Sequence, residues 1–175
     1  MTFGILIKAY GSNNMLQESF EIFQDMLQMK LVPNAVTYGC LLDACVKNGQ
    51  LEKAEEVWQS MGYHQVKLNT ILYTTMIKAY SKAFMLEKAI ELYNKMMEEK
   101  QSNPEVAPNN VTYNSLLDCC VRCFSMPQAE SIFKTMCDQA RKFQNSIKPD
   151  LITYSTIIKG YCKDRNIEQA LITLE

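Results

Sequence analysis

The stretch V-T-Y-N-S-L-L-D at residues 111–118 is one copy of a motif that returns along the whole chain. Related motifs are M-T-F-G at residues 1–4, V-T-Y-G at 36–39, I-L-Y-T at 71–74 and I-T-Y-S at 152–155. Their aromatic residues stand at positions 3, 38, 73, 113 and 154, so the steps are 35, 35, 40 and 41 residues. A period of this size indicates an array of stacked repeats.

Each repeat carries two helical patterns. Tyr113 is followed by Leu116, Leu117 and Cys120, a spacing of i, i+3, i+4 and i+7 that marks one face of an α-helix. A second stripe then brings a small residue, an apolar residue, an aromatic residue and a methionine. We expect the small residue to let the two helices approach closely; it is Ser19, Ala54, Ala89, Ala129 or Ala170.

The residues between the patterns fit helix boundaries. Pro33, Pro108 and Pro149 would stop the preceding helix. Threonines before the aromatic are good N-cap residues, and we expect them to begin the first helix of their units: Thr2, Thr37, Thr112 and Thr153. Leu68 and Leu72 replace the proline and the threonine at one boundary. The two longer steps place polar insertions at 98–107 and 139–146, where loops are tolerated.

These patterns predict an all-α fold, a right-handed α-solenoid of stacked helix-turn-helix repeats about 35 residues long. Residues 1–175 would form a single array with units at 1–34, 35–69, 70–109, 110–150 and a partial unit at 151–175. The last unit stops inside its second helix, with Leu171 and Leu174 in need of cover. We therefore expect an excerpt of a longer protein, or an end that packs on another copy or another protein.

The composition narrows the function classes. The net charge is −1, so overall charge does not by itself point to nucleic acid. The seven cysteines are read as small apolar residues, because the C-x-x-C of Cys120 and Cys123 lacks a second ligand pair and His64 is the only histidine. No cofactor or metal is expected. No apolar run approaches the length of a membrane span.

Catalysis also has little support in these residues. Thr74, Ser115 and Ser155 have no partnering histidine, and Asp43, Asp118 and Asp164 are scattered rather than clustered as in a metal-dependent nuclease. We expect no enzyme activity from this chain, although a catalytic domain outside it would be compatible with the same repeats.

The motif at 111–118, the stretch K-P-D-L-I-T-Y-S-T-I-I-K-G-Y-C-K at 148–163 and G-Q-L-E-K-A-E-E-V-W at 49–58 resemble the pentatricopeptide-repeat family. Tetratricopeptide repeats open on W-x₂-L-G-x₂-Y, which does not recur here. The resemblance implies single-stranded RNA as the partner, with one base per repeat. It also implies a role in organellar RNA metabolism in the mitochondrion or plastid, through processing, stability, editing or translation.

The resemblance assigns roles to columns of residues. The base-selecting column pairs the residue after the aromatic with the last residue of the unit: Gly4 with Asn34, Gly39 with Asn69, Thr74 with Asn109, Asn114 with Asp150, and Ser155 with a partner beyond the chain. The base-packing column is Met1, Val36, Ile71, Val111 and Ile152. The phosphate column is Lys47, Lys82, Arg122 and Lys163, with Ser12 leaving the first unit doubtful.

The chemistry of these columns suits the assignment, because Asn offers a donor and an acceptor, Asp accepts only, and Thr or Ser offers a hydroxyl. By the resemblance, Thr with Asn favours adenine, Asn with Asp favours uracil and Ser suggests a purine. Glycine has no side chain to bond a base. The expected target is therefore 5′-N-N-A-U-purine, with the N-terminus toward the RNA 5′ end.

Simpler interpretations remain open at this point. The Asn and Asp residues could be plain turn residues, and the basic column could be a solvated face. The tyrosines Tyr38, Tyr73, Tyr113 and Tyr154 are expected in the core against the neighbouring repeat rather than exposed for stacking. The alternative function is a protein-binding helical-repeat scaffold, which uses the same kind of inner surface.

Overall fold

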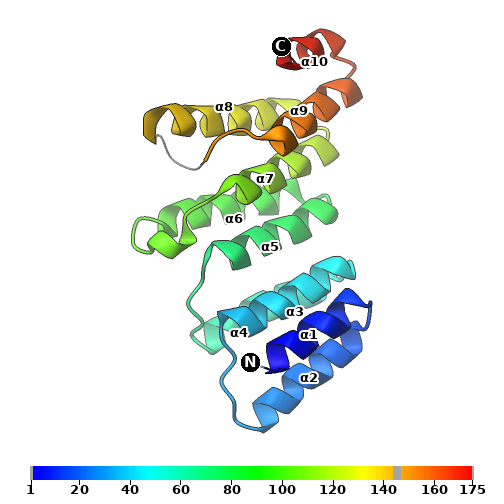
Figure 1. Ribbon diagram of the computed structural model, residues 1–175, viewed down its shortest axis with the longest axis vertical. Coiled ribbons are helices and arrows are strands. Elements are labelled where there is room, and N and C mark those ends of the chain that lie inside the picture. Colours follow the sequence, from blue (N-terminus) through cyan, green and yellow to red (C-terminus); the bar gives the residue numbers. More distant parts are fainter. Residues whose placement is uncertain (1, 144–146, 175) are drawn as a thin grey trace.

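The computed structural model describes residues 2–143 and 147–174. In these ranges the chain forms α-helices and one short 3₁₀ helix, in an order that follows the repeats (Figure 1). They are α1 (Thr2–Ser12), α2 (Leu16–Gln28), α3 (Ala35–Lys47), α4 (Leu51–Tyr63), α5 (Thr70–Lys82), α6 (Leu86–Glu99), η1 (Pro104–Val106), α7 (Asn110–Arg122), α8 (Met126–Phe143), α9 (Leu151–Lys163) and α10 (Ile167–Leu174).

The helices are stacked as pairs in chain order (Figure 1). The first helix of each pair packs on the first helix of the next, so α1, α3, α5, α7 and α9 form a continuous row. The second helix of each pair covers that row from one side. One apolar core cluster runs from Ile7 in α1 to Cys119 in α7, and a second cluster lies around Ile157. The other side of the row of first helices is left open.

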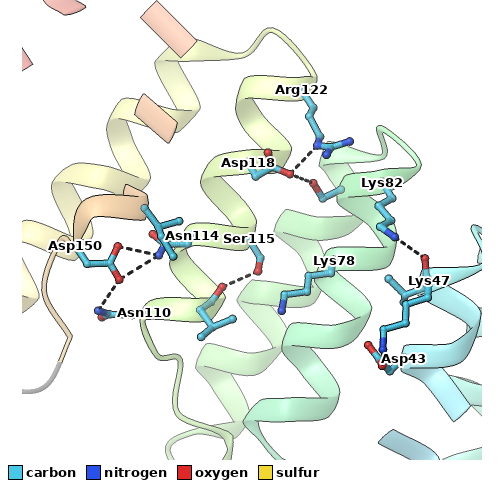
Figure 2. A pocket seen from close by; sticks show the side chains of 14 residues that line it. Asp43, Lys47, Lys78, Lys82, Asn110, Asn114, Ser115, Asp118, Arg122 and Asp150 are labelled. Carbon is cyan, nitrogen blue, oxygen red and sulfur yellow. Dashed lines mark hydrogen bonds and ion pairs between the residues drawn. The ribbon is translucent and has the colours of Figure 1, made fainter. Parts of the chain in front are cut away.

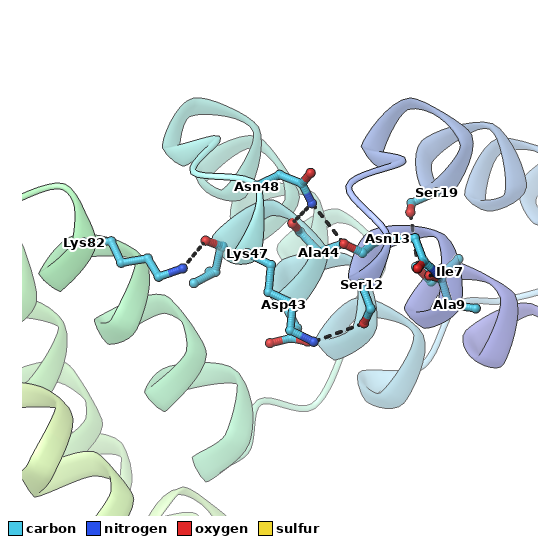
Figure 3. Close-up of polar contacts among 12 residues, drawn as sticks. Ile7, Ala9, Ser12, Asn13, Ser19, Asp43, Ala44, Lys47, Asn48 and Lys82 are labelled. Carbon is cyan, nitrogen blue, oxygen red and sulfur yellow. Dashed lines mark hydrogen bonds and ion pairs between the residues drawn. The ribbon is translucent and has the colours of Figure 1, made fainter.

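The column of small residues lies where the two helices of a pair meet. Its alanines are buried, and Ser19 is buried with its hydroxyl donating to the Ile7 carbonyl at 3.2 Å (Figure 3). The expected close approach within each pair is confirmed. Neighbouring first helices also meet closely at one point, since a Cβ on Gly11 would overlap the Cβ of Ala44 and lie 3.0 Å from its Cα.

The recurring aromatic residues build contacts between repeats. An aromatic of each second helix packs edge-on against the tyrosine that opens the next repeat. These pairs are Phe23–Tyr38, Trp58–Tyr73, Tyr93–Tyr113 and Phe133–Tyr154, with ring centroids 5.2 to 6.0 Å apart. Tyr38, Tyr73 and Tyr113 are buried, as expected, whereas Tyr154 at the open end is 40% exposed.

The helix caps differ from the prediction. The N-caps of α3, α5, α7 and α9 are Asn34, Asn69, Asn109 and Asp150, not the threonines. Thr37, Thr112 and Thr153 stand three residues later, inside the helices, and Thr2 is the first residue of α1. Asn and Asp are at least as good as Thr at an N-cap. Thr112 and Thr153 instead complete capping boxes by accepting from the backbone N–H of Asn109 and Asp150.

The first insertion folds back onto the loop of the preceding repeat. The Thr70 hydroxyl lies 2.8 and 2.7 Å from the carbonyl oxygens of Glu105 and Ala107, and the Asn103 amide donates to the Leu68 carbonyl at 3.2 Å. Lys67 and Glu105 form an exposed ion pair at 3.2 Å. These contacts hold the one boundary that lacks both the proline and the threonine.

The linker after α8 is tied in the same way. The Asn110 side chain donates to the Lys148 carbonyl at 3.0 Å and accepts from the Lys148 N–H at 3.1 Å. The first residue of α5 and of α7 therefore anchors the next linker along the array.

The buried cysteines are part of the core. Cys45, Cys119 and Cys120 are fully buried, and burial raises the pKa of each thiol to about 12. These thiols are therefore protonated at neutral pH and pack as small apolar groups. Among the described residues no helix has the length and apolar character needed to cross a membrane.

Candidate nucleic-acid interface

The base-packing column is exposed on the open side of the first helices. Val36, Ile71, Val111 and Ile152 lie in the first turn of α3, α5, α7 and α9, with 69%, 68%, 48% and 62% of each residue exposed. Four aliphatic side chains in register and in solvent are unusual for a helix face that serves only packing. Met1, the fifth member of the column, lies outside the described residues.

The base-selecting pair of the fourth repeat is in direct contact. The Asn114 amide donates to Oδ1 of Asp150 at 3.1 Å (Figure 2). The Thr153 hydroxyl lies 2.7 Å from Oδ1 of Asn114. Asp150 also receives the backbone N–H of Thr153 at 2.9 Å. This last bond is the main reason why the pKa of Asp150 is below its ordinary value, so the carboxylate stays charged at neutral pH.

The third repeat is built differently from the expectation. Thr74 is buried, with 5% of the residue exposed, and its hydroxyl lies 2.8 Å from that of Thr112. The Thr112 hydroxyl in turn donates to Oδ1 of Asn109 at 3.1 Å. Thr74 is thus linked to its partner Asn109 through Thr112, and Asn109 is the exposed member of the pair.

The remaining base-selecting positions have space around them. A Cβ at Gly4 would meet nothing within 4 Å, and one at Gly39 would touch only the Leu72 side chain at 3.7 Å. Their partners in the base-selecting column, Asn34 and Asn69, are the N-cap residues of α3 and α5. Ser155 is exposed and its hydroxyl donates to the Ile152 carbonyl at 3.0 Å.

Capping and base contact use different atoms of the same side chain. In Asn34, Asn69 and Asn109 the oxygen Oδ1 accepts the helix N–H groups. Because Oδ1 is fixed there, the side chain is held in one orientation and its NH₂ group carries the remaining donors. A turn role and a base-selecting role are therefore compatible.

The phosphate column lies at the other end of the first helices. The Lys47 ammonium is 2.7 Å from Asp43 and donates to the Ser12 hydroxyl at 3.1 Å. The Arg122 Nε is 2.6 Å from Asp118. The other two members of the column make different contacts. Lys82 donates to the Val46 carbonyl at 2.8 Å (Figure 3), and the Lys163 ammonium lies 5.4 Å from the Phe124 ring centroid.

The columns meet in a groove with a cavity of about 470 Å³ along α3, α5, α7 and the start of α9 (Figure 2). Its lining includes Lys82, Arg122, Asn114, Asp150 and Val111 from the three predicted columns.

Three charged groove residues were missed by the sequence reasoning. They are Asp43, Lys78 and Asp118, which also line the groove. Each stands four residues before a member of the phosphate column, so it shares that member's helix face. That spacing was the signal available in the sequence.

Comparison with known proteins agrees with this geometry. Profiles of the PPR repeat family match residues 1–47, 33–71 and 108–163, and profiles of the PPR repeat match 71–100 and 152–175. This chain belongs to the pentatricopeptide-repeat family. A pentatricopeptide repeat-containing protein of Arabidopsis thaliana is 28% identical over 75 residues, which are 43% of this chain and 14% of that relative. The chain therefore spans about a seventh of the relative's length.

Solved pentatricopeptide-repeat structures share the fold. PPR10 from maize superposes with a TM-score of 0.76 at 23% identity, over 98% of this chain and 23% of PPR10. PPR10 in complex with an 18-nucleotide psaJ RNA element superposes with a TM-score of 0.66 at 22% identity, over 99% of this chain and 29% of that PPR10 chain. The repeat domain of Arabidopsis thaliana protein-only RNase P 1, in complex with tRNA, superposes with a TM-score of 0.73 at 15% identity. The match covers 96% of this chain and 83% of that domain. The expected all-α, right-handed α-solenoid of helix pairs is confirmed.

Proposed function

We propose that this array binds single-stranded RNA along the groove of its first helices, with one base per repeat. The observation that carries the proposal is the fourth repeat, where the bonded pair Asn114 and Asp150 lies beside exposed Val111 and Ile152. A base inserted between the two aliphatic side chains would present its edge to the pair. PPR10 in complex with an 18-nucleotide RNA element and the repeat domain of protein-only RNase P 1 in complex with tRNA support the same class of partner.

The proposed base order is 5′-N-N-A-U-purine. At the fourth repeat the charged Asp150 offers acceptors, and uracil presents an N–H at N3. At the third repeat the Thr74 hydroxyl is already bonded to Thr112, so the amide of Asn109 would be the group that selects adenine. Gly4 and Gly39 give the first two repeats little means to discriminate.

The expected affinity of this chain alone is weak. Aromatic stacking contributes roughly 1–3 kcal/mol per base, and aliphatic packing belongs at the lower end of that range. Five bases at this level are opposed by the loss of translational and rotational freedom on association, about 4–15 kcal/mol. We infer that these repeats act within a longer array. A role in mitochondrial or plastid RNA processing, stability, editing or translation belongs to the same proposal.

Fluorescence anisotropy with short labelled RNAs at low salt tests this function. The chain should prefer an RNA containing A-U over one with the two bases exchanged, and Lys82→Glu with Arg122→Glu should abolish binding. Lys95→Glu is the matched control, because Lys95 lies on α6 and pairs with Glu91 outside the groove. Equal affinity for both RNAs would reject the base order. Unchanged binding after the double substitution would favour the protein-binding scaffold instead.

A further inference from the structure

A second column of charged residues stands one helical turn before the phosphate column, and its members Asp43, Lys78 and Asp118 line the groove. Its members alternate in sign from repeat to repeat: Lys8, Asp43, Lys78, Asp118 and Lys159. The phosphate column is Ser12 in the first repeat and basic in the other four. Because residues i and i+4 are neighbours on a helix, each repeat presents a two-residue charge unit to the groove.

The even repeats present neutral units. Asp43 and Lys47 form an ion pair at 2.7 Å, with 43% and 44% of the side chains exposed. Asp118 and Arg122 form one at 2.6 Å, with 37% and 38% exposed, and Asp118 also accepts from the Ser81 hydroxyl at 3.1 Å. A phosphate placed at either unit would meet a cation that already has a carboxylate within 2.7 Å, so repulsion would offset attraction.

The odd repeats present positive units. Lys78 and Lys82 in α5 are both exposed, as are Lys159 and Lys163 in α9, and within the described residues none of the four forms an ion pair. Figure 2 shows Lys78 and Lys82 on the same helix, between the Asp43–Lys47 and Asp118–Arg122 pairs. The first repeat contributes Lys8 alone, beside Ser12. A phosphate at the third or fifth repeat is attracted by two lysines and faces no carboxylate of its own unit.

We propose that the array holds the RNA backbone at alternate repeats. Lys78 with Lys82, and Lys159 with Lys163, bind the phosphates that face the third and fifth repeats. Asp43 and Asp118 cancel the charge of Lys47 and Arg122, so the second and fourth repeats contact their nucleotides through the bases alone. This inference rests on the RNA-binding function proposed above and adds Lys78 and Lys159 as phosphate-binding residues.

The alternation could also serve the protein itself, because Lys8 and Lys78 each have an acidic residue in the next repeat and Lys159 has Asp118 in the preceding one. If the column only stabilises the fold, substituting its residues should change the melting temperature. The dependence of RNA affinity on individual phosphates should then stay the same. The two roles are therefore separated by measuring RNA binding one phosphate at a time.

A methylphosphonate scan provides this measurement. Short A-U-containing RNAs, each with one uncharged linkage, are titrated against the chain at low salt. The proposal predicts an alternating pattern, in which neutralising a linkage at the third or fifth repeat weakens binding roughly tenfold, as expected for a lost hydrogen bond to a charged group. Linkages at the second and fourth repeats should change affinity less than about twofold.

Substitutions then test the assigned residues. Asp43→Asn should free Lys47 and make the second-repeat linkage sensitive, and Asp118→Asn should do so for the fourth while its amide oxygen still accepts from Ser81. Lys78→Gln should reduce the sensitivity at the third repeat, whereas Lys95→Gln on α6 should change none. Melting curves confirm that each variant is folded.

Equal sensitivity at the second to fifth repeats, or a pattern unaffected by Asp43→Asn, would overturn the inference and leave RNA binding intact. Absence of binding to the unmodified RNA at low salt would overturn the proposed function as well.

Discussion

Asn114 and Asp150 hold each other in place across a repeat boundary. The Asn114 amide donates to the Asp150 carboxylate at 3.1 Å, although 36 residues separate the two in sequence (Figure 2). Asp150 at the same time caps α9. The residue pair assigned to one base is therefore already hydrogen-bonded in the RNA-free chain, and its orientation depends on the fold of two repeats.

Asp150→Asn should change the base preference of the fourth repeat. The amide oxygen can still cap α9, but the second oxygen becomes an NH₂ donor, which suits the N3 acceptor of cytosine rather than the N3–H of uracil. We expect the preference for uracil over cytosine to fall roughly tenfold or to reverse. Affinities for two RNAs that differ at this base measure it. Asp138→Asn in α8 is the control, and an unchanged preference would refute the assignment.

The Asp150 cap should also appear in the pH dependence of stability. Hydrogen bonds, first that from the Thr153 N–H, hold the pKa of Asp150 below its ordinary value of 3.8 in the folded chain. The stabilisation is then complete above the unfolded pKa and is lost as the pH falls through the lower, folded pKa. The difference in unfolding free energy between the chain and Asp150→Asn should be constant near neutral pH and should shrink below about pH 4. A difference that grew on acidification would contradict this sign.

Two glycines should respond in opposite ways to alanine. At Gly11 of α1 the added Cβ would overlap Ala44 of α3, so Gly11→Ala should destabilise the fold by about 1–3 kcal/mol. At Gly62 of α4 the Cβ would meet nothing within 4 Å, so Gly62→Ala should stabilise it by about 0.5–1 kcal/mol. Urea unfolding followed by circular dichroism measures both. Similar effects at the two sites would show that the α1–α3 contact is not tight.

Phe84 occupies a backbone conformation that suits glycine or asparagine. Its φ is +58° and 62% of the residue is exposed, in the turn between α5 and α6. Phe84→Asn should therefore raise the stability by about 1 kcal/mol, because asparagine tolerates the left-handed region better. Phe84→Ala is the control, since it keeps the strain and should give no comparable gain. A lower melting temperature for the asparagine variant would mean that the ring makes a needed contact.

The sequence predicted the repeating part of this structure well. The helix pairs, the buried small residues and the tyrosines in the core all follow from spacing, because each repeat can bury its apolar face only against its neighbours. The buried state of Tyr38 and Tyr113 in particular followed from their fixed place in the period.

The site was predicted less completely, because its details depend on contacts between repeats. Thr74 was expected to meet a base, but the structure directs its hydroxyl to Thr112 of the next unit. The threonines were expected as caps, yet the preceding Asn or Asp is the better acceptor and occupies that position. The base-selecting, base-packing and phosphate roles remain proposals until RNA binding is measured.

The back-folded linkers join neighbouring repeats along one edge of the array. Thr70 and Asn110 fasten successive linkers to one another at the edge where the first helices begin. The base-selecting residues lie at this fastened edge, whereas the phosphate column lies at the far ends of the same helices. If the solenoid tightened or opened, these contacts would restrain the edge that carries the bases more than the opposite edge. The spacing between bases would then stay nearly constant while the spacing between the cationic ends follows the pitch of the bound strand.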